Sequence, residues 1–329
     1  MSTTTRDVLR IDNLSAAFFT KEGVVRAVNG VNLALKENSI MALVGESGCG
    51  KSATALAILG LLPYPGQITE GHVYLNGADL TIMKPDQIRH IRGREIGMVF
   101  QDPMSSLNPS TTIGSQVEEV LLAHTNATNQ EARIWAEELL AEMGLPDANR
   151  LLQRYAFQLS GGMRQRVMMA IALALRPKVL IADEPTSNLD TTLQASILNH
   201  LQRLKEEYGT TILLITHDMG IVAQMADEVA VMYAGAVVEH TDTTSLFQKP
   251  AHPYTFGLFQ ALPRLDHADR QLRAMPGRPP TLLDLPEECP FLRRCFKATN
   301  VCRSSPKPLL RFIEAGHQVA CFNEMHQGR

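Results

Sequence analysis

The chain has 329 residues, of which 45% are hydrophobic and 20% are charged, and its formal net charge is -3. This length predicts two structural units, and the weak net charge gives no basis for bulk electrostatic binding to nucleic acid. The apolar runs fall short of the roughly 18–20 residues that cross a bilayer, and residues 1–7 are polar, without the apolar stretch of a signal peptide. We therefore expect a cytosolic chain that reaches a membrane only through partner subunits.

Short strands dominate the elements predicted in the first hundred residues. Apolar segments bounded by turn residues predict strands at residues 8–11, 14–19, 24–35, 40–44, 73–75 and 96–100. The run at 40–44 is apolar throughout, which is typical of a strand buried on both faces. It leads through a glycine-rich turn into a helix of small residues at 52–61, which Pro63, Pro65 and Gly66 end.

Longer helices are predicted further along the chain. The pattern is helical from residue 112 to 175, and the clearest segments are helices at 131–143 and 194–208 and buried strands at 179–182 and 211–216. Strands that alternate with helices predict a largely parallel sheet with helices on its faces, the α/β class. Beyond residue 262 prolines recur and long periodic segments vanish, so we place a domain boundary near residue 263.

A phosphate-binding loop is predicted at residues 45–52, which read GESGCGKS and match the pattern G-x-x-x-x-G-K-[ST] between a strand and a helix. Glycines let the backbone wrap closely, so that successive N–H groups point at phosphate oxygens. The helix that begins near Lys51 presents free N–H groups and its positive dipole end to the same anion. Lys51 is predicted to reach the β- and γ-phosphates of ATP and Ser52 to bind Mg²⁺.

The members of this predicted ATP site are Gly45, Glu46, Ser47, Gly48, Cys49, Gly50, Lys51 and Ser52. Cys49 is interpreted as a small filler of the loop, without a role as a reactive thiol.

A second apolar strand ends in two adjacent acids, Asp183 and Glu184. A solvated strand end is the plainer interpretation, but beside a phosphate loop a cation or a proton-transfer task explains the pair better. Asp183 is predicted to hold Mg²⁺, directly or through water, and Glu184 to orient and deprotonate the attacking water.

Two more polar residues follow predicted strands, at the edge where the ligands of such sheets gather. His217 comes after the strand at 211–216 and is predicted to bond the γ-phosphate, and Gln101 comes after the strand at 96–100 and is predicted to sense the metal or the water. Taken alone, a histidine or a glutamine at a strand end also fits a structural role.

Residues 159–166, LSGGMRQR, indicate the class of protein, because they resemble the LSGGQ signature of ABC ATPases with Met163 in the fifth place. Ser160, Gly161 and Gly162 open a helix and make a second anion-binding helix end in the same chain. One ATP needs only one such anion-binding helix end from each chain. The second is therefore interpreted as closing on a nucleotide that another subunit holds.

The order of these motifs resembles an ABC nucleotide-binding domain throughout residues 7–262. The resemblance implies a P-loop NTPase fold over residues 1–262, with a RecA-like core, an antiparallel β subdomain and a helical subdomain at about residues 103–175. A small Cys-rich C-terminal extension at residues 263–329 follows.

The same resemblance implies further roles for single residues. It implies head-to-tail dimerisation, with Ser160, Gly161 and Gly162 of one subunit facing the ATP of the other. It implies that Phe18 stacks on adenine, although a core position for Phe18 is an alternative, and it places Asp190, which ends the D-loop, among the nucleotide-site residues. Asn188 departs from the family pattern, because the D-loop usually carries a small residue there.

The tail narrows the resemblance to the dipeptide, oligopeptide and nickel importer ATPases. It is carried by His252-Pro253-Tyr254-Thr255, by the tail from Cys289 onward and by QDPMSSLNP at residues 101–109. It implies two transmembrane permease subunits, a second ATPase subunit that is a paralogue or a copy of this chain, and, indirectly, an extracytoplasmic solute-binding protein. It also implies no nucleic-acid partner and a peripheral location on the cytoplasmic face of the plasma (inner) membrane.

Four of the five cysteines cluster near the C-terminus: Cys289, Cys295, Cys302 and Cys321. In a cytosolic protein such a cluster favours metal or redox chemistry over disulfides. The intervals of 5, 6 and 18 residues lack the close pairs usual in zinc knuckles. We therefore expect a [4Fe–4S] cluster with a structural role, which the resemblance supports, and zinc is the alternative.

Three functions compete at this stage. The leading hypothesis is an ATPase subunit that energises the import of di- or oligopeptides or of a related solute such as nickel. A soluble ABC ATPase acting on nucleic acid or ribosomes usually carries a long coiled-coil insertion or two ATPase domains, and the sequence shows neither. A P-loop kinase is disfavoured by the signature at residues 159–166.

Overall fold

The computed structural model describes residues 6–187, 189–261, 275–283 and 285–325. These residues form two compact units that alternate along the chain. The first unit contains the described residues before 10, residues 34–40 and residues 74–215, and the second contains residues 10–33, 41–73 and the described residues from 216 onward. The domain boundary predicted near residue 263 lies outside the described residues.

Three short parallel strands organise the first unit. They are β6 (Ile96–Val99), β7 (Val179–Asp183) and β8 (Thr211–Thr216), and β7 lies between the other two. Every residue of β7 and β8 is buried, which explains their continuous apolar sequences. The parallel arrangement confirms the α/β prediction, and it places Asp183 opposite Ile215 at the carboxyl ends of β7 and β8.

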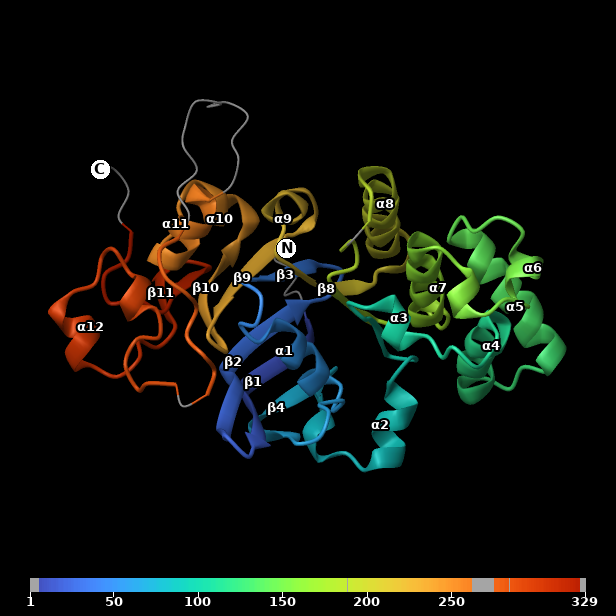
Figure 1. Ribbon diagram of the computed structural model, residues 1–329, viewed down its shortest axis with the longest axis horizontal. Helices are drawn as coiled ribbons and strands as arrows, with labels where there is room; N and C mark the ends of the chain where they lie inside the picture. Colours follow the sequence, from blue (N-terminus) through green and yellow to red (C-terminus); the bar gives the residue numbers. More distant parts are fainter. Residues whose placement is uncertain (1–5, 188, 262–274, 284, 326–329) are drawn as a thin grey trace. The chain divides into compact units, whose positions relative to one another are not determined.

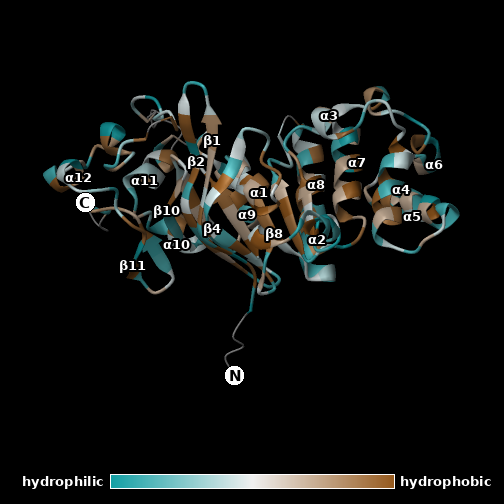
Figure 2. Ribbon diagram, turned by 90° about the horizontal axis from the view of Figure 1, so that it is seen from below, coloured by the Kyte–Doolittle hydropathy of each residue, from teal (hydrophilic) through white to brown (hydrophobic). Residues whose placement is uncertain are grey.

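Helices make up most of the rest of the first unit (Figure 1). They are α2 (Pro85–Ile91), α3 (Pro103–Ser106), α4 (Ile113–His124), α5 (Asn129–Glu142), α6 (Ala148–Leu151), α7 (Gly161–Leu173) and α8 (Thr191–Tyr208). Thr128 caps α5 through a reciprocal bond with Glu131, which fixes where this helix starts. Brown and teal bands alternate along α4 and α5, as expected of helices that are buried on one side (Figure 2).

The second unit contains most of a twisted sheet of long strands. Its strands are β1 (Asp7–Thr20), β2 (Gly23–Lys36), β4 (Gly66–Leu75) and the short β5 (Ala78–Asp79), in the order β2-β1-β4-β5. The sequence predicted two strands where β1 is continuous. The chain passes Asn13 with a φ of 48°, so a residue that suits a turn is accommodated inside the strand.

A second group of strands in this unit carries the phosphate-binding loop. Strand β3 (Ile40–Val44) pairs in parallel with β9 (Glu228–Tyr233), and β10 (Ala236–Asp242) returns antiparallel to β9. The C-terminal region continues the row with β12 (His317–Val319) and β11 (Arg311–Glu314). The helices of this unit are α1 (Lys51–Ile58), α9 (Met219–Met225), α10 (Thr243–Gln248), α11 (Pro253–Gln260) and α12 (Asn300–Ser304).

The C-terminal region shares its core with the strands that carry the loop. Phe291 is 2% exposed and belongs to the same buried cluster as Val44, Tyr233 and Tyr254. Its ring packs edge-on against Tyr233 at a centroid distance of 5.3 Å. The Pro-rich tail therefore packs on the core of the second unit, in keeping with its lack of apolar periodicity.

Within the described part of the chain, no helix combines the length and the apolar character needed to span a bilayer.

Candidate functional site

The phosphate-binding loop lies between β3 and α1, as the motif requires. Gly50 caps α1 with a φ of 112°, and Lys51 is the first residue of the helix. The Lys51 side chain folds back over the loop, and its Nζ donates to the carbonyl oxygens of Gly45 at 2.8 Å and Glu46 at 3.1 Å. Lys51 is only 6% exposed, so its charge is held against the loop by these carbonyls.

Two glycines of the loop are required by space as well as by backbone angle. A Cβ on Gly45, whose φ is 156°, would lie 2.2 Å from the carbonyl oxygen of Met232. A Cβ on Gly50 would lie 2.2 Å from the carbonyl oxygen of Ala27. The loop is thus pressed against the neighbouring backbone, while Ser47 and Gly48 are exposed on its outer side.

Cys49 faces the interior of the loop. It is 6% exposed, and its Sγ lies 3.9 Å from the Nζ of Lys51. Burial raises the pKa of the Cys49 thiol, so it stays protonated and is a poor nucleophile. The interpretation of Cys49 as a filler fits this position.

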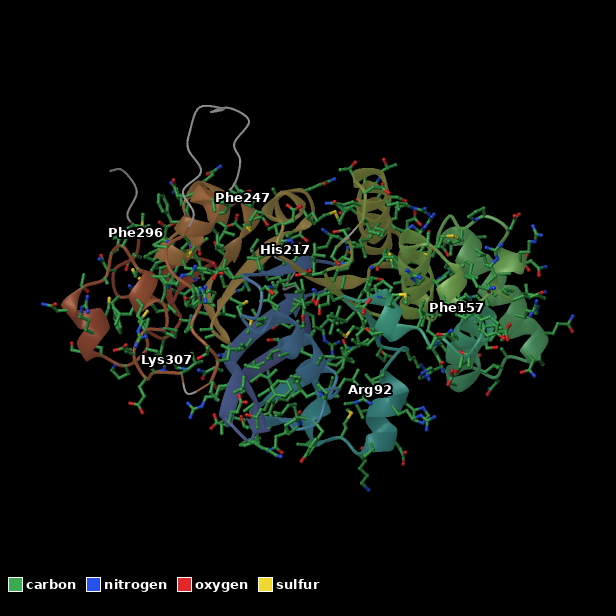
Figure 3. The ribbon with its side chains drawn as sticks, viewed as in Figure 1. Arg92, Phe157, His217, Phe247, Phe296 and Lys307 are labelled. Carbon is green, nitrogen blue, oxygen red and sulfur yellow. The ribbon has the colours of Figure 1, made fainter. Side chains whose placement is uncertain are left out.

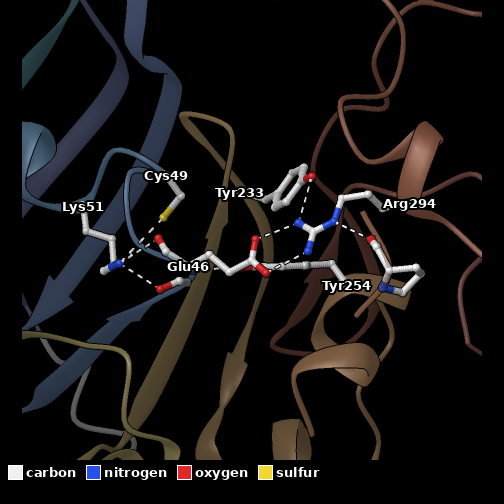
Figure 4. A network of polar contacts seen from close by, with 8 residues as sticks. Glu46, Cys49, Lys51, Tyr233, Tyr254 and Arg294 are labelled. Atoms are coloured by element: carbon white, nitrogen blue, oxygen red, sulfur yellow. Dashed lines mark hydrogen bonds and ion pairs between the residues drawn. The ribbon is translucent and has the colours of Figure 1, made fainter. Parts of the chain in front are cut away.

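Glu46 is tied to residues that lie more than 200 positions further along the chain (Figure 4). Its backbone N–H donates to the hydroxyl of Tyr254 at 2.8 Å, and its carboxylate accepts from both terminal nitrogens of Arg294, at 2.6 and 2.9 Å. The Glu46 amide therefore has a protein acceptor, as does the amide of Cys49, which donates to the Glu46 carbonyl oxygen at 3.3 Å. No local sequence pattern points to Arg294, because its contact with Glu46 spans 248 positions.

The start of α11 explains how Tyr254 reaches the loop. His252 caps this helix, and its Nδ1 accepts from the N–H of Tyr254 at 3.0 Å. Complete burial lowers the pKa of His252 to about 4, so the ring is neutral and able to accept. The buried carboxylate of Glu239 accepts from the N–H groups of Ala251 and His252, at 2.6 and 2.8 Å. The segment HPYT at residues 252–255 thus positions the Tyr254 hydroxyl to accept from the Glu46 amide.

The carboxylate pair lies in the first unit, at the end of β7. Asp183 is 3% exposed and is the last residue of the strand. Glu184 follows with a φ of 47°, a left-handed conformation that a non-glycine residue rarely adopts, and its N–H donates to the carbonyl oxygen of Ile215 at 2.9 Å. Such conformations cost of order 1–3 kcal/mol and occur most often at functional sites.

Gln101 and Glu184 are brought together in this unit. The Nε2 of Gln101 donates to Oε2 of Glu184 at 3.1 Å, although 83 positions separate the two residues. Both follow parallel neighbouring strands, β6 and β7, which explains why their side chains meet.

The signature segment opens α7 as predicted. Ser160 is its N-cap, and the Ser160 hydroxyl accepts from the N–H of Met163 at 3.4 Å. A Cβ on Gly161 would meet open space, whereas a Cβ on Gly162 would lie 2.5 Å from Cδ1 of Leu193. Ser160 and Gly161 are exposed, so this helix end is accessible to a ligand.

A buried glutamine joins α7 to the carboxylate strand. Gln165 is 2% exposed, and its Nε2 donates to the carbonyl oxygen of Pro185 at 2.7 Å, one residue beyond Glu184. Gln165 has no predicted role, and the local signal for it in the sequence is its place one turn inside the signature helix.

The remaining predicted residues are placed as follows. His217 is exposed just after β8 (Figure 3). Phe18 is half-buried, and its ring packs against the backbone of Gly66. Asp190 caps α8 by accepting from the N–H of Leu193 at 2.9 Å. Asn188, the departure from the D-loop pattern, lies outside the described residues.

The candidate residues thus divide between the units. The loop at residues 45–52, Phe18 and His217 belong to the second unit, and Gln101, Asp183, Glu184, the signature residues and Asp190 belong to the first.

The four C-terminal cysteines gather around one small cavity. Cys289, Cys295, Cys302 and Cys321 all line it, and its volume is about 10 Å³, enough for one water molecule at most. Burial raises the pKa of Cys289 to about 11 and that of Cys321 to about 12, and the neighbouring thiols add to both shifts. Among the described residues, no group of three or more His, Cys, Asp or Glu side chains has the geometry to hold a metal ion.

Comparisons with known proteins place this geometry in a family. Residues 28–187 match the family model described as ABC transporter, and residues 238–302 match the model described as oligopeptide/dipeptide transporter, C-terminal region. The oligopeptide transport ATP-binding protein OppD of Haemophilus influenzae is 46% identical over 91% of this chain and 93% of its own length. The chain belongs to the family of ATP-binding subunits of ABC transporters.

Other relatives of this ABC subunit agree over nearly the whole chain. The oligopeptide transport ATP-binding protein AppD of Bacillus subtilis is 45% identical and covers 98% of each chain, and the dipeptide transport ATP-binding protein DppD of Escherichia coli is 42% identical over 95% of this chain and 96% of its own. These matches confirm the resemblance read from the signature and the tail.

A solved structure supports the fold assignment. A dimeric ATP-binding cassette in a post-hydrolysis state, bound to ADP and Pi, superposes with a TM-score of 0.65 at 31% identity, covering 71% of this chain and 98% of that one. The ABC ATPase fold predicted from the motifs is thereby confirmed.

Proposed function

We propose that this chain hydrolyses ATP to energise an ABC importer for dipeptides or oligopeptides. The observation that carries the proposal is the full-length match to oligopeptide and dipeptide transport ATP-binding proteins, at 42–46% identity. The match includes the C-terminal region as well as the ATPase core. Family membership supports ATP hydrolysis directly, and the peptide solute follows from the names of the relatives.

The phosphate-binding loop supplies the grip on ATP. Backbone N–H groups of the loop and of the first turn of α1 would bond the phosphate oxygens. Lys51 is already folded over the loop, and on ATP binding its ammonium group would exchange the carbonyls of Gly45 and Glu46 for phosphate oxygens. Because Nζ already lies at the loop, the exchange would need only a short movement of the side chain.

Three residues would hold Mg²⁺ and one would activate water. The Ser52 hydroxyl, Gln101 and the buried carboxylate of Asp183 are the proposed metal site, and oxygen donors of this kind suit the ion. The bound ion would neutralise charge that develops on the phosphates. Glu184 would take the proton of the attacking water, with Gln101 bonded to its carboxylate at 3.1 Å, and His217 would bond the γ-phosphate.

The second anion-binding helix end supports a two-subunit site. Ser160 and Gly161 are exposed at the start of α7, and we propose that they bond the ATP on the loop of a second ATPase subunit, which is a paralogue or a copy of this chain. The dimeric state of the similar cassette supports this arrangement. Phe18 would stack on adenine, and Asp190 would be one of the nucleotide-site residues.

The proposed assembly places the chain at a membrane through its partners. Two transmembrane permease subunits would bind the ATPase pair on the cytoplasmic face of the plasma membrane, and an extracytoplasmic solute-binding protein would deliver the peptide. The relatives' role as transport subunits supports this location.

Isolation of the tagged full-length chain from its native cells tests the assembly. We expect it to co-purify from detergent-solubilised membranes with two hydrophobic permease subunits, because an importer ATPase works only when docked to them. Mass spectrometry identifies the partners. Recovery with ribosomes or DNA in place of membrane subunits would instead support a soluble ABC ATPase and reject the importer.

Glu184→Gln tests the catalytic role of this carboxylate. The variant is expected to bind ATP as tightly as the wild type and to lose about 10²–10⁴-fold in turnover, because an amide cannot accept the proton from water. Steady-state phosphate release and nucleotide binding are measured on the same preparation. Glu138→Gln, an exposed change on α5, is the matched control and should hydrolyse ATP normally. Turnover within about twofold of the wild type in Glu184→Gln would reject the general base.

We further propose that the four C-terminal cysteines bind a [4Fe–4S] cluster. The gathering of all four cysteines in one place and their soft thiol donors support a metal-sulfur site, although a cluster would have to open the cavity well beyond its 10 Å³. Zinc, which needs its four sulfurs within about 4 Å of one another, is the alternative. The thiols must also lose their protons on ligation, against the raised pKa values of Cys289 and Cys321.

Iron and acid-labile sulfide in protein purified without oxygen test the cluster. We expect about four of each per chain and a brown colour. Cys302→Ser should lose most of the iron, whereas Cys49→Ser, which changes the cysteine outside the cluster, should retain it. A colourless protein with stoichiometric zinc would replace the cluster with the zinc alternative, and a metal-free protein would reject both.

A further inference from the structure

Glu46 connects the phosphate-binding loop to Tyr254 on α11 through its amide and to Arg294 in the C-terminal region through its carboxylate. Its carbonyl oxygen accepts from Lys51 at 3.1 Å, its N–H donates to Tyr254 at 2.8 Å, and its carboxylate accepts a two-pronged bond from Arg294 at 2.6 and 2.9 Å. Planar, two-pronged pairs of this kind fix orientation as well as distance. Glu46, whose carbonyl bonds Lys51, is therefore also held by Arg294 near the C-terminus (Figure 4).

Arg294 is itself fixed before it meets Glu46. It lies in the 3-10 turn Leu292–Arg294, directly after the core residue Phe291. Its Nε donates to the carbonyl oxygen of Pro276 at 3.0 Å and its Nη1 also donates to the Tyr233 hydroxyl at 3.3 Å. The Arg294 side chain is 5% exposed and that of Glu46 is 26% exposed, so the pair is largely shielded from water. The Arg294 guanidinium thus makes four hydrogen bonds, two of them to Glu46, which together fix its position.

The charge of Arg294 also matters for a polyanionic ligand. Glu46 places a carboxylate in a loop whose task is to bind phosphates, and like charges in a partly buried site repel strongly. Arg294 neutralises that carboxylate. Without the arginine, the Glu46 carboxylate would lose its cationic partner beside the phosphates, and Glu46 would lose the restraint that fixes the carbonyl bonded by Lys51.

We propose that Arg294 is a positioning residue for ATP binding: from the C-terminal region it holds and neutralises Glu46, and thereby keeps the phosphate-binding loop ready for ATP. The inference rests on the proposed ATPase function. It assigns to the C-terminal region a part in nucleotide binding. Arg294 acts through Glu46 and Lys51 and does not contact the reacting atoms. Its loss should therefore weaken ATP affinity and leave the rate of the chemical step unchanged.

Nucleotide affinity and steady-state ATPase rates of full-length variants test the proposal. Arg294→Met is expected to raise both the Kd for MgATP and the KM about tenfold, with kcat within about twofold of the wild type. Arg294→Lys should recover part of the loss, since a lysine restores the charge but not the fork. Arg293→Met is the matched control, because this neighbouring arginine is exposed, and it should bind ATP like the wild type.

A double-mutant cycle with Glu46→Gln supplies the decisive contrast. The double variant Glu46→Gln/Arg294→Met should bind ATP more tightly than Arg294→Met alone, because it removes the carboxylate left without a partner. Unchanged affinity in Arg294→Met, or losses in the single variants that simply add, would overturn the proposal. If Arg294→Met does not fold by circular dichroism, Arg294→Lys and Glu46→Gln carry the same test. A wild-type chain that fails to bind ATP would instead reject the proposed function.

Discussion

The structure depends on the phosphate-binding loop at residues 45–52, whose backbone at two glycines packs so closely on neighbouring backbone that no side chain fits there. At Gly45 and Gly50 the positive φ angles and the adjacent carbonyls of Met232 and Ala27 leave no room for a Cβ. This close packing sets the conformation of the loop, and the Nζ of Lys51 donates to the carbonyls of Gly45 and Glu46. The remaining features of the second unit, from the buried strand β3 to the placement of Tyr254, hold this loop in place.

The C-terminal region also helps to hold this loop, through packing and an ion pair. Phe291 completes the core beside Tyr233 and Tyr254, and the turn that follows it presents Arg294 to the loop. Cys289 and Cys295 bracket that turn, and the N–H of Cys295 donates to the carbonyl oxygen of Leu292 at 3.3 Å. A region that the sequence marks only by prolines and cysteines is thus connected to the nucleotide site by one ion pair and a shared core. This connection gives a physical reason for ATPase core and tail to occur together.

Local patterns predicted the parts of the site that are contiguous in sequence. The apolar strands at 40–44, 179–182 and 211–216, the glycine loop and the cap of the signature helix are each encoded within a few residues. Contacts between distant segments were not predictable in this way. Arg294 gave no signal because it meets Glu46 across 248 positions. The strands β9 and β10 were not assigned, although β9 is largely apolar. The bond between Gln101 and Glu184 was foreseeable only as two side chains at one sheet edge.

Calorimetric titration of the full-length chain with ATP, with and without Mg²⁺, tests the central claim most directly. If the loop at residues 45–52 grips the phosphates as its geometry indicates, the wild type binds ATP with an affinity that Mg²⁺ raises. Lys51→Ala, which removes the ammonium group held above Gly45 and Glu46, then loses most of that affinity. Absence of binding in the wild type, or equal binding in Lys51→Ala, would contradict the account.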